Sequence, residues 1–252
     1  MRRDTFVSRL DERLRTDDYA DVDASANGLQ VGRAEGTVER VALAVDAAEA
    51  TIREAIDREA DLLLVHHGLA WGGFDRLTGL DYDRIEPLVE NDVALYVSHL
   101  PLDGHQELGN AAGVADVLNL TDREPFGEYG PEYVGTRGTA TETYDADDVS
   151  TLLDKALDTE TQVLGFGPNE IEEVGIVTGS GVDWIGAAAE AGLDALVTGE
   201  GKQKAYHEAR DRGLNVFLAG HYATETFGVR ALGRVAEEWG IETTYIDHPT
   251  GI

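Results

Sequence analysis

The sequence contains no cysteine, and only three of its 252 residues are lysine. Without cysteine there is no disulfide framework, and any metal site has to use nitrogen and oxygen ligands. No apolar run is long enough to span a bilayer, and the first residues lead into a polar helical pattern without a signal-peptide core. We therefore expect a cytoplasmic protein that does not cross a membrane.

Basic residues as a class are also scarce. Lys and Arg total 20 against 49 Asp and Glu, which gives a net charge of −29. Phosphate contacts require clustered Lys and Arg, so nucleic acid is not expected as a partner. Molar salt screens the repulsion between so many carboxylates, so the composition is typical of a salt-loaded cytoplasm, such as that of a halophilic archaeon. An acidic disordered protein is excluded because the hydrophobic pattern is intact.

Strand-like and helix-like patterns alternate along the chain, and the succession occurs twice. The strand patterns lie at 38–45, 61–65 and 93–98, and again at 173–178, 194–198 and 215–219. The helical patterns lie at 47–59 and about 82–91, and again at 184–190 and 204–212. Strand, helix and strand with short joints predict parallel βαβ units. We therefore predict an α/β fold of two similar lobes with mainly parallel strands, residues 1–122 and 123–252, joined through a glycine-rich loop and edge strand at 125–142.

An adjacent histidine pair, His66 and His67, follows the apolar run 62–65 and precedes Gly68. Neighbouring side chains on a continuing strand point to opposite faces, whereas a bend at the strand end would let both imidazoles converge. Imidazole is the commonest protein ligand for transition metals, so the pair is a candidate metal site. A surface pair at a strand end is the alternative interpretation.

Other polar residues follow the later strands, where ligands of open α/β sheets bind. They are His99 with Asp103, Glu200, and His221 with Glu225. His221 and Glu225 would share one face of an opening helix turn, although a histidine at a helix start is ordinary. Asp103 follows Pro101 and is expected on an irregular turn, where an Asp is often only a turn former. The predicted site lies at the strand carboxyl ends between the lobes.

The candidate ligands supply three nitrogens and two carboxylates, which is too many for one tetrahedral zinc. They are His66, His67, Asp103, His221 and Glu225. The set suits two divalent ions that lie about 3.5–4 Å apart and share a bridging carboxylate. Zn²⁺, Fe²⁺ and Mn²⁺ are the ions that fit these donors. A single metal with spectator histidines is the alternative.

Four further residues are candidates for chemistry at this site. His99 and Glu200 are candidate proton shuttles, and His99 is equally compatible with a ligand, a supporting partner or a polar strand end. Lys202 and Lys204, two of only three lysines, follow the predicted strand end and indicate an anionic substrate. The alternative for these lysines is that they are solvated residues at a helix start.

Several motifs occur together in one order. They are Asn27-Gly28-Leu29-Gln30-Val31-Gly32, His66-His67-Gly68-Leu69-Ala70-Trp71-Gly72-Gly73, His99-Leu100-Pro101-Leu102-Asp103, Thr198-Gly199-Glu200 and Ala219-Gly220-His221-Tyr222-Ala223-Thr224-Glu225. Together they resemble the NIF-three-like dinuclear metal-centre family, whose members carry the description GTP cyclohydrolase I type 2 homologue. The resemblance covers nearly the whole chain, and at 252 residues we expect the chain to lack the inserted middle domain of longer relatives.

The resemblance implies two divalent ions per chain on the same five ligands, with Glu225 as the bridge, and assembly of the chain into a homohexameric ring. It implies a metal-dependent hydrolase of a nucleotide or related small anion, with GTP suggested by analogy alone. The absence of a phosphate-cradling glycine loop argues against an NTPase, and a two-metal phosphoesterase is the nearest alternative enzyme. The rival class is a non-catalytic metal-binding ring scaffold or a protein that binds a regulatory partner.

Overall fold

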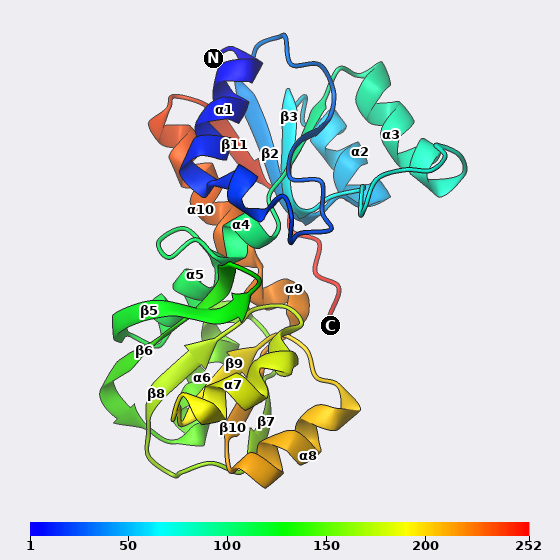
Figure 1. Cartoon of the computed structure of the whole chain (residues 1–252). Coiled ribbons are helices and arrows are strands. Elements are labelled where there is room, and N and C mark those ends of the chain that lie inside the picture. Colours follow the sequence, from blue (N-terminus) through cyan, green and yellow to red (C-terminus); the bar gives the residue numbers. More distant parts are fainter. Residues whose placement is uncertain (252) are drawn as a thin grey trace. The chain divides into compact units, whose positions relative to one another are not determined.

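The computed structural model describes residues 1–251, and the chain forms two compact units, each built on one sheet (Figure 1). Unit 1 comprises Met1–Leu102 and Gly228–His248, and unit 2 comprises Asp103–Phe227 and the residues from Pro249 onward. Among the described residues, no helix is both long and apolar enough to cross a membrane.

Unit 1 contains five strands in the order β1-β4-β3-β2-β11. The strands are β1 (Gly28–Val31), β2 (Arg40–Asp46), β3 (Leu62–His67), β4 (Ala94–Val97) and β11 (Glu242–Tyr245). The helices that begin in this unit are α1 (Arg3–Leu14), η1 (Thr16–Tyr19), α2 (Glu49–Asp57), α3 (Leu80–Glu90) and α4 (Leu100–Asp103). The pairs β11–β2, β2–β3 and β3–β4 are parallel, and β1 joins the edge antiparallel to β4.

Helices cover both faces of this sheet, which explains its continuous apolar strands. Leu63 and Val65 of β3 pack in one cluster with Ile52 of α2 and Leu88 of α3. On the opposite face, the Tyr96 hydroxyl of β4 donates a hydrogen bond to Asp11 of α1, 2.8 Å away. Strands that are buried on both faces read as unbroken hydrophobic runs, as residues 62–65 do.

Within the residues that the structure describes, unit 2 contains six strands in the order β5-β6-β8-β9-β10-β7. The strands are β5 (Leu120–Tyr129), β6 (Glu132–Tyr144), β7 (Gln162–Gly165), β8 (Ile171–Ile176), β9 (Ala195–Thr198) and β10 (Asn215–Leu218). The helices are α5 (Asn110–Val117), α6 (Ala146–Leu157), η2 (Gly181–Trp184), α7 (Ile185–Glu190), α8 (Gln203–Arg212), α9 (His221–Thr224) and α10 (Thr226–Glu238), the last of which continues into unit 1.

The centre of this second sheet is parallel, and its flanks are antiparallel. Strands β8, β9 and β10 pair in parallel, whereas β6 joins β8, β5 joins β6 and β7 joins β10 in antiparallel register. Helices α5 and α6 pack on one face in a cluster that includes Val114, Val149 and Phe217. The α/β class with two sheets is confirmed, with parallel pairing prevalent in unit 1 and confined to the centre in unit 2.

Two details differ from the sequence-based expectation. The segment 125–142, predicted as a loop and an edge strand, belongs to the long β5–β6 hairpin, which turns at Gly130 with a φ of 63°. Its strand β5 does form the edge of the sheet, but the second strand β6 stands where the loop was expected. The unit boundary falls at residue 103 rather than at 122, because α5 packs on β6 of unit 2. Residues 228–248 return to unit 1, where β11 pairs with β2.

The predicted repeat is present as a repeat of topology. In unit 1 the strands β2, β3 and β4 lie in chain order, with the preceding strand β1 antiparallel at the edge next to β4. In unit 2 the strands β8, β9 and β10 lie in the same order, with β7 antiparallel next to β10. In each unit, residues that the sequence marks as functional therefore follow the carboxyl ends of two adjacent strands.

Candidate metal centre

His66 and His67 are the last two residues of strand β3. The strand was predicted to end at Val65, but it continues through both histidines, because His67 still pairs with Asp46 of β2 in parallel register. The imidazole centroids nevertheless lie 4.6 Å apart, with the rings tilted by 47°. His66 is fully buried, and His67 is partly exposed. The two rings therefore lie together at the carboxyl end of the strand.

An oxygen acceptor holds the Nδ1 atom of each of these rings. His66 Nδ1 donates to the carbonyl oxygen of Ser98 at 2.8 Å, and His67 Nδ1 contacts Asp46 Oδ1 at 2.8 Å. A carbonyl oxygen can only accept, so the proton of a neutral His66 lies on Nδ1. This arrangement is typical of metal-ligating histidines, because it fixes the ring and leaves the lone pair of Nε2 available for a metal ion.

His99 joins the same cluster from the segment that follows β4. Its ring centroid lies 5.1 Å from that of His66 and 5.7 Å from that of His67. Its Nδ1 donates to Asp23 Oδ1 at 2.9 Å, and its backbone N–H donates to the Asn27 side chain at 2.7 Å. The third imidazole is therefore anchored in the same way as the first two.

Asp23 is the buried anchor of this segment. Besides His99, its carboxylate accepts from the backbone N–H of Ser25 at 2.8 Å and Leu100 at 3.0 Å, and from the Asn27 amide at 2.8 Å. Burial by itself raises the pKa of Asp23, but the hydrogen bond and charge of His99 and the other donors outweigh it and lower that pKa. Asp23 is therefore held as a carboxylate next to His99.

The three histidines offer ring nitrogens that all lie within 4.8 Å of one another. Neutral imidazoles at this separation can converge on one ion, and a nitrogen donor set suits Zn²⁺, Fe²⁺ or Mn²⁺. The residues present in unit 1 thus fit a metal ion by their chemistry and by the way their rings are fixed.

In unit 2, His221 and Glu225 lie where β10 ends and the chain turns at Gly220, whose φ is 89°. The predicted opening helix turn is present as a short helix of its own: α9 ends at Thr224, Glu225 caps it, and α10 starts at Thr226. His221 Nε2 lies 3.2 Å from Glu225 Oε1, and the Glu225 side chain is buried. The predicted His–Glu pair is therefore in contact although the helix breaks.

Two glycines make room for this pair. A Cβ atom on Gly179, whose φ is 58°, would lie 2.2 Å from Glu225 Oε1, and a Cβ on Gly199 would lie 2.7 Å from His221 Cα. Gly179 N–H also donates to Thr224 Oγ1 at 3.2 Å. Because only glycine leaves this space, the backbone of residue 179 packs directly under the carboxylate.

Asp103 was predicted to lie on an irregular turn, but it lies at the end of the one-turn helix α4. Pro101 is compatible with a first helical turn, where its missing N–H has no helical partner to lose. Asp103 is buried, and its Oδ1 accepts from the Asn110 amide at 2.8 Å and from Thr178 Oγ1 at 3.3 Å. The carboxylate is thus fixed within unit 2.

Glu200 follows β9 in unit 2 and lies next to His221. Its Oε1 is 3.6 Å from His221 Nδ1, and it accepts a hydrogen bond from the Ser180 hydroxyl. Glu200 therefore lies near Nδ1 of His221, whereas Glu225 contacts Nε2. An acid therefore lies on each side of the imidazole.

Lys202 and Lys204 both form ion pairs with Asp183. Lys202 Nζ lies 3.1 Å from its carboxylate, and Lys204 contacts the other oxygen. The hydrogen bond from Lys204 is the main cause that lowers the pKa of Asp183, and Asp183 in turn raises the pKa of Lys204. All three side chains are exposed, so any anion that binds these lysines has to compete with Asp183.

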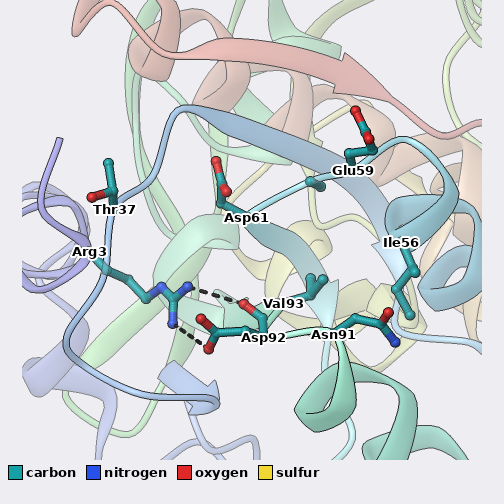
Figure 2. A pocket seen from close by; sticks show the side chains of 9 residues that line it. Arg3, Thr37, Ile56, Glu59, Asp61, Asn91, Asp92 and Val93 are labelled. Carbon is teal, nitrogen blue, oxygen red and sulfur yellow. Dashed lines mark hydrogen bonds and ion pairs between the residues drawn. The ribbon is translucent and has the colours of Figure 1, made fainter.

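A cavity of about 480 Å³ lies in unit 1 next to residues that precede strands β2, β3 and β4 (Figure 2). Its buried Arg3 donates to the carbonyl oxygens of Arg33 and Asp92, at 3.1 and 3.2 Å. Asp61, which also lines the cavity, accepts from the backbone N–H groups of residues 39 and 40 at 2.8 Å each. Its polar groups thus serve the fold, and none of the residues predicted for the site lines this cavity.

Sequence reasoning missed Asp23 and Asp46, the carboxylates behind His99 and His67. Asp46 had a signal, because it ends a strand next to β3 and parallel strands end at one edge of a sheet. Asp23 had none, since it lies 76 positions before its partner, outside any strand.

The fold and these residues define a two-unit α/β protein whose His, Asp and Glu groups can hold a metal ion. The model of the family Duf34/NIF3 (NGG1p interacting factor 3) matches residues 1–250. The chain belongs to this family.

Named relatives and solved structures agree with this assignment. The GTP cyclohydrolase 1 type 2 homolog of Halobacterium salinarum is 58% identical and is covered over 98% of each chain. The homolog from Deinococcus radiodurans is 42% identical over 99% of this chain and 94% of the relative. The structure of TTHA1606 from Thermus thermophilus is 40% identical with a TM-score of 0.90, and that of protein ybgI, of unknown function, is 34% identical with a TM-score of 0.91; each match covers 100% of both chains.

Proposed function

We propose that this protein is a dinuclear-metal-dependent hydrolase that acts on a nucleotide or a related small anion. The ligands are His66, His67, Asp103, His221 and Glu225, with Glu225 as the bridge. The observation that carries the metal assignment is the histidine cluster of unit 1. Two of its members, His66 and His67, are proposed ligands, each with Nδ1 held by an oxygen, and their ring nitrogens lie within 4.8 Å of each other and of the third member, His99. Protein imidazoles are fixed in this way where they bind metals.

Bound divalent ions would supply Lewis acidity, polarising the bond to be cleaved and lowering the pKa of a water. The protein's own residues hold the ligands in place: Asp46 orients His67, and Asn110 orients Asp103. His99 and Glu200 are the proposed proton-transfer groups, because each has a titratable side chain next to a proposed ligand. The donors are nitrogen and oxygen only, which favours Zn²⁺, Fe²⁺ or Mn²⁺.

The nucleotide substrate class rests on the names of the relatives. The Halobacterium salinarum protein is named a GTP cyclohydrolase 1 type 2 homolog, which makes GTP the first compound to test. Lys202 and Lys204 are the proposed contacts for its charge. We also place the protein in a salt-rich cytoplasm and propose a homohexameric ring, which light scattering in molar KCl would measure.

The test is turnover of GTP in molar KCl with added Mn²⁺, Fe²⁺ or Zn²⁺, followed by release of formate and of the ring-opened product. Metal content is measured on the same samples. Glu225→Gln should lose at least one ion per chain and all turnover, whereas the control Glu142→Gln, on the exposed part of β6, should lose neither. Unchanged metal content in Glu225→Gln would contradict the bridging role.

A non-catalytic metal-binding ring scaffold is the second candidate. It is favoured by the family description, which names an interacting factor of another protein and not an enzyme. Metal-replete protein that turns over neither GTP nor a panel of phosphoesters would support this candidate and refute the hydrolase.

A further inference from the structure

Trp71 lies beside the histidine cluster of unit 1. Its ring centroid is 5.0 Å from that of His99, with the rings at 80°, and 6.1 Å from that of His67. The side chain is nevertheless 46% exposed. One part of the indole thus lies against the ring of His99 and near that of the proposed ligand His67, and another part is open to solvent.

The position of the indole is fixed by several bonds. Trp71 forms an isolated β-bridge with Ser25, and the N–H groups of residues 69 and 70 donate to Gln30 Oε1 at 2.6 and 3.0 Å. The indole N–H donates to the carbonyl oxygen of Gly68 at 3.2 Å. An aromatic ring that is held in place before a ligand arrives loses little conformational freedom on binding.

The chain that follows Trp71 leaves space beside it. Gly72 and Gly73 have φ values of 73° and 95°, and a Cβ atom on either would meet nothing within 4 Å. Phe74 and Leu77, farther along the same segment, are also exposed. The indole thus borders open space on the side where the chain departs.

We propose that Trp71 is a substrate-binding residue that stacks on the planar heteroaromatic ring of the ligand. The inference rests on the proposed function, since it assumes that the ligand is held at the histidines. A flat, apolar ring next to metal ligands matches a base whose own faces are flat and whose polar groups lie at its edge. Stacking on an aromatic side chain does not distinguish one base from another, because every base has a flat face. Recognition of the base edge by hydrogen bonds is therefore left to other residues.

The experiment compares guanosine monophosphate with ribose 5-phosphate, which lacks only the base. Binding of each compound to metal-loaded protein is measured by calorimetry in molar KCl. Trp71→Ala should weaken binding of guanosine monophosphate about 5- to 100-fold and leave ribose 5-phosphate unchanged. Trp71→Phe should retain most of the affinity, because the aromatic face remains. The matched control is Trp184→Ala in unit 2, whose indole N–H likewise donates to a backbone carbonyl, that of Glu128 at 3.3 Å.

Equal affinity of Trp71→Ala and wild type for guanosine monophosphate would overturn the stacking and leave the proposed function intact. Equal losses for both compounds, or a loss of metal, would show that Trp71 only shields the histidines, and would overturn the inference as well. Metal-loaded wild type that binds neither compound would also overturn it. Wild type that takes up no metal would refute the proposed function instead, and binding of guanosine monophosphate that depends on Trp71 would still support stacking.

Discussion

The two units place different chemistry at the ends of equivalent strands. The ends of β3 and β4 in unit 1 present three imidazoles, and the ends of β9 and β10 in unit 2 present glycines, one imidazole and two carboxylates. Pairing sets the correspondence, because Val65 lies opposite Val97 as Thr198 lies opposite Leu218. By this register His66 and His67 match Gly199 and Glu200. The shared topology supplies the location, and the side chains in each unit decide whether nitrogen or oxygen donors occupy it.

The largest effect is expected from replacing one ligand in each unit. His66→Gln and His221→Gln should each weaken metal binding by more than the 10- to 100-fold that is typical of losing a supporting residue. Titration with Mn²⁺ and Zn²⁺ measures the affinity and the number of ions per chain. If each variant lost one ion and left the other ion's affinity untouched, the units would bind metal independently and the dinuclear proposal would be wrong.

The carboxylate behind His67 should matter less than a ligand. Asp46→Asn keeps the shape but weakens the hydrogen bond to His67 Nδ1, and we expect metal affinity to fall about 10- to 100-fold. Asp83→Asn, an exposed acid in α3, is the control for the loss of one charge. The same titration checks the result, and equal affinities for the two variants would remove Asp46 from the site.

Gly179→Ala tests the packing of unit 2. The variant carries the strain of a positive φ, about 1–2 kcal/mol, and its Cβ also displaces the Glu225 carboxylate. Gly192→Ala is the matched control, because its φ is 73° and its Cβ would meet nothing within 4 Å. Both variants should unfold at lower denaturant concentration than wild type, and only Gly179→Ala should lose metal affinity, by about 10-fold. Similar metal affinities would separate Gly179 from the site.

Asp23→Asn tests the anchor of His99 through its dependence on pH. Because the folded pKa of Asp23 is lowered, its contribution to stability is present above the unfolded value of about 3.9 and is lost as the pH falls through the folded pKa. We expect the metal-free variant to be about 1–3 kcal/mol less stable at pH 7, with the difference shrinking below about pH 4. Urea unfolding in molar KCl across this range measures it. A difference independent of pH would mean that the charge of Asp23 is not what stabilises the segment.

The smallest effect is expected from Lys202→Ala and Lys204→Ala. Their ion pairs with Asp183 are exposed, so the thermal midpoint should hardly change. If these lysines bind the substrate's charge, KM should rise several-fold with kcat unchanged, and more so at low salt. Unchanged KM in both variants would leave them as solvated residues at a helix start.

Much of the fold was predictable because it depends on local pattern. The buried strands read as apolar runs, and the histidine doublet ended one of them. The β5–β6 hairpin was harder, because β5 exposes most of its residues and shows little alternation. The anchor Asp23 could not be found, since its partner lies 76 positions away and no periodicity links them. Strand-end chemistry was thus readable, whereas the contacts that orient it depend on tertiary structure.

The position of β11 in the chain has a consequence for the order of synthesis. Unit 1 needs residues 228–248 to add this strand beside β2, so its sheet is incomplete until most of the chain has left the ribosome. The sheet of unit 2 is contained in the continuous segment 103–227. Domains fold as units during translation. Unit 2, although it is made later, can therefore finish folding first, while the sheet that carries the three histidines still lacks its edge strand β11.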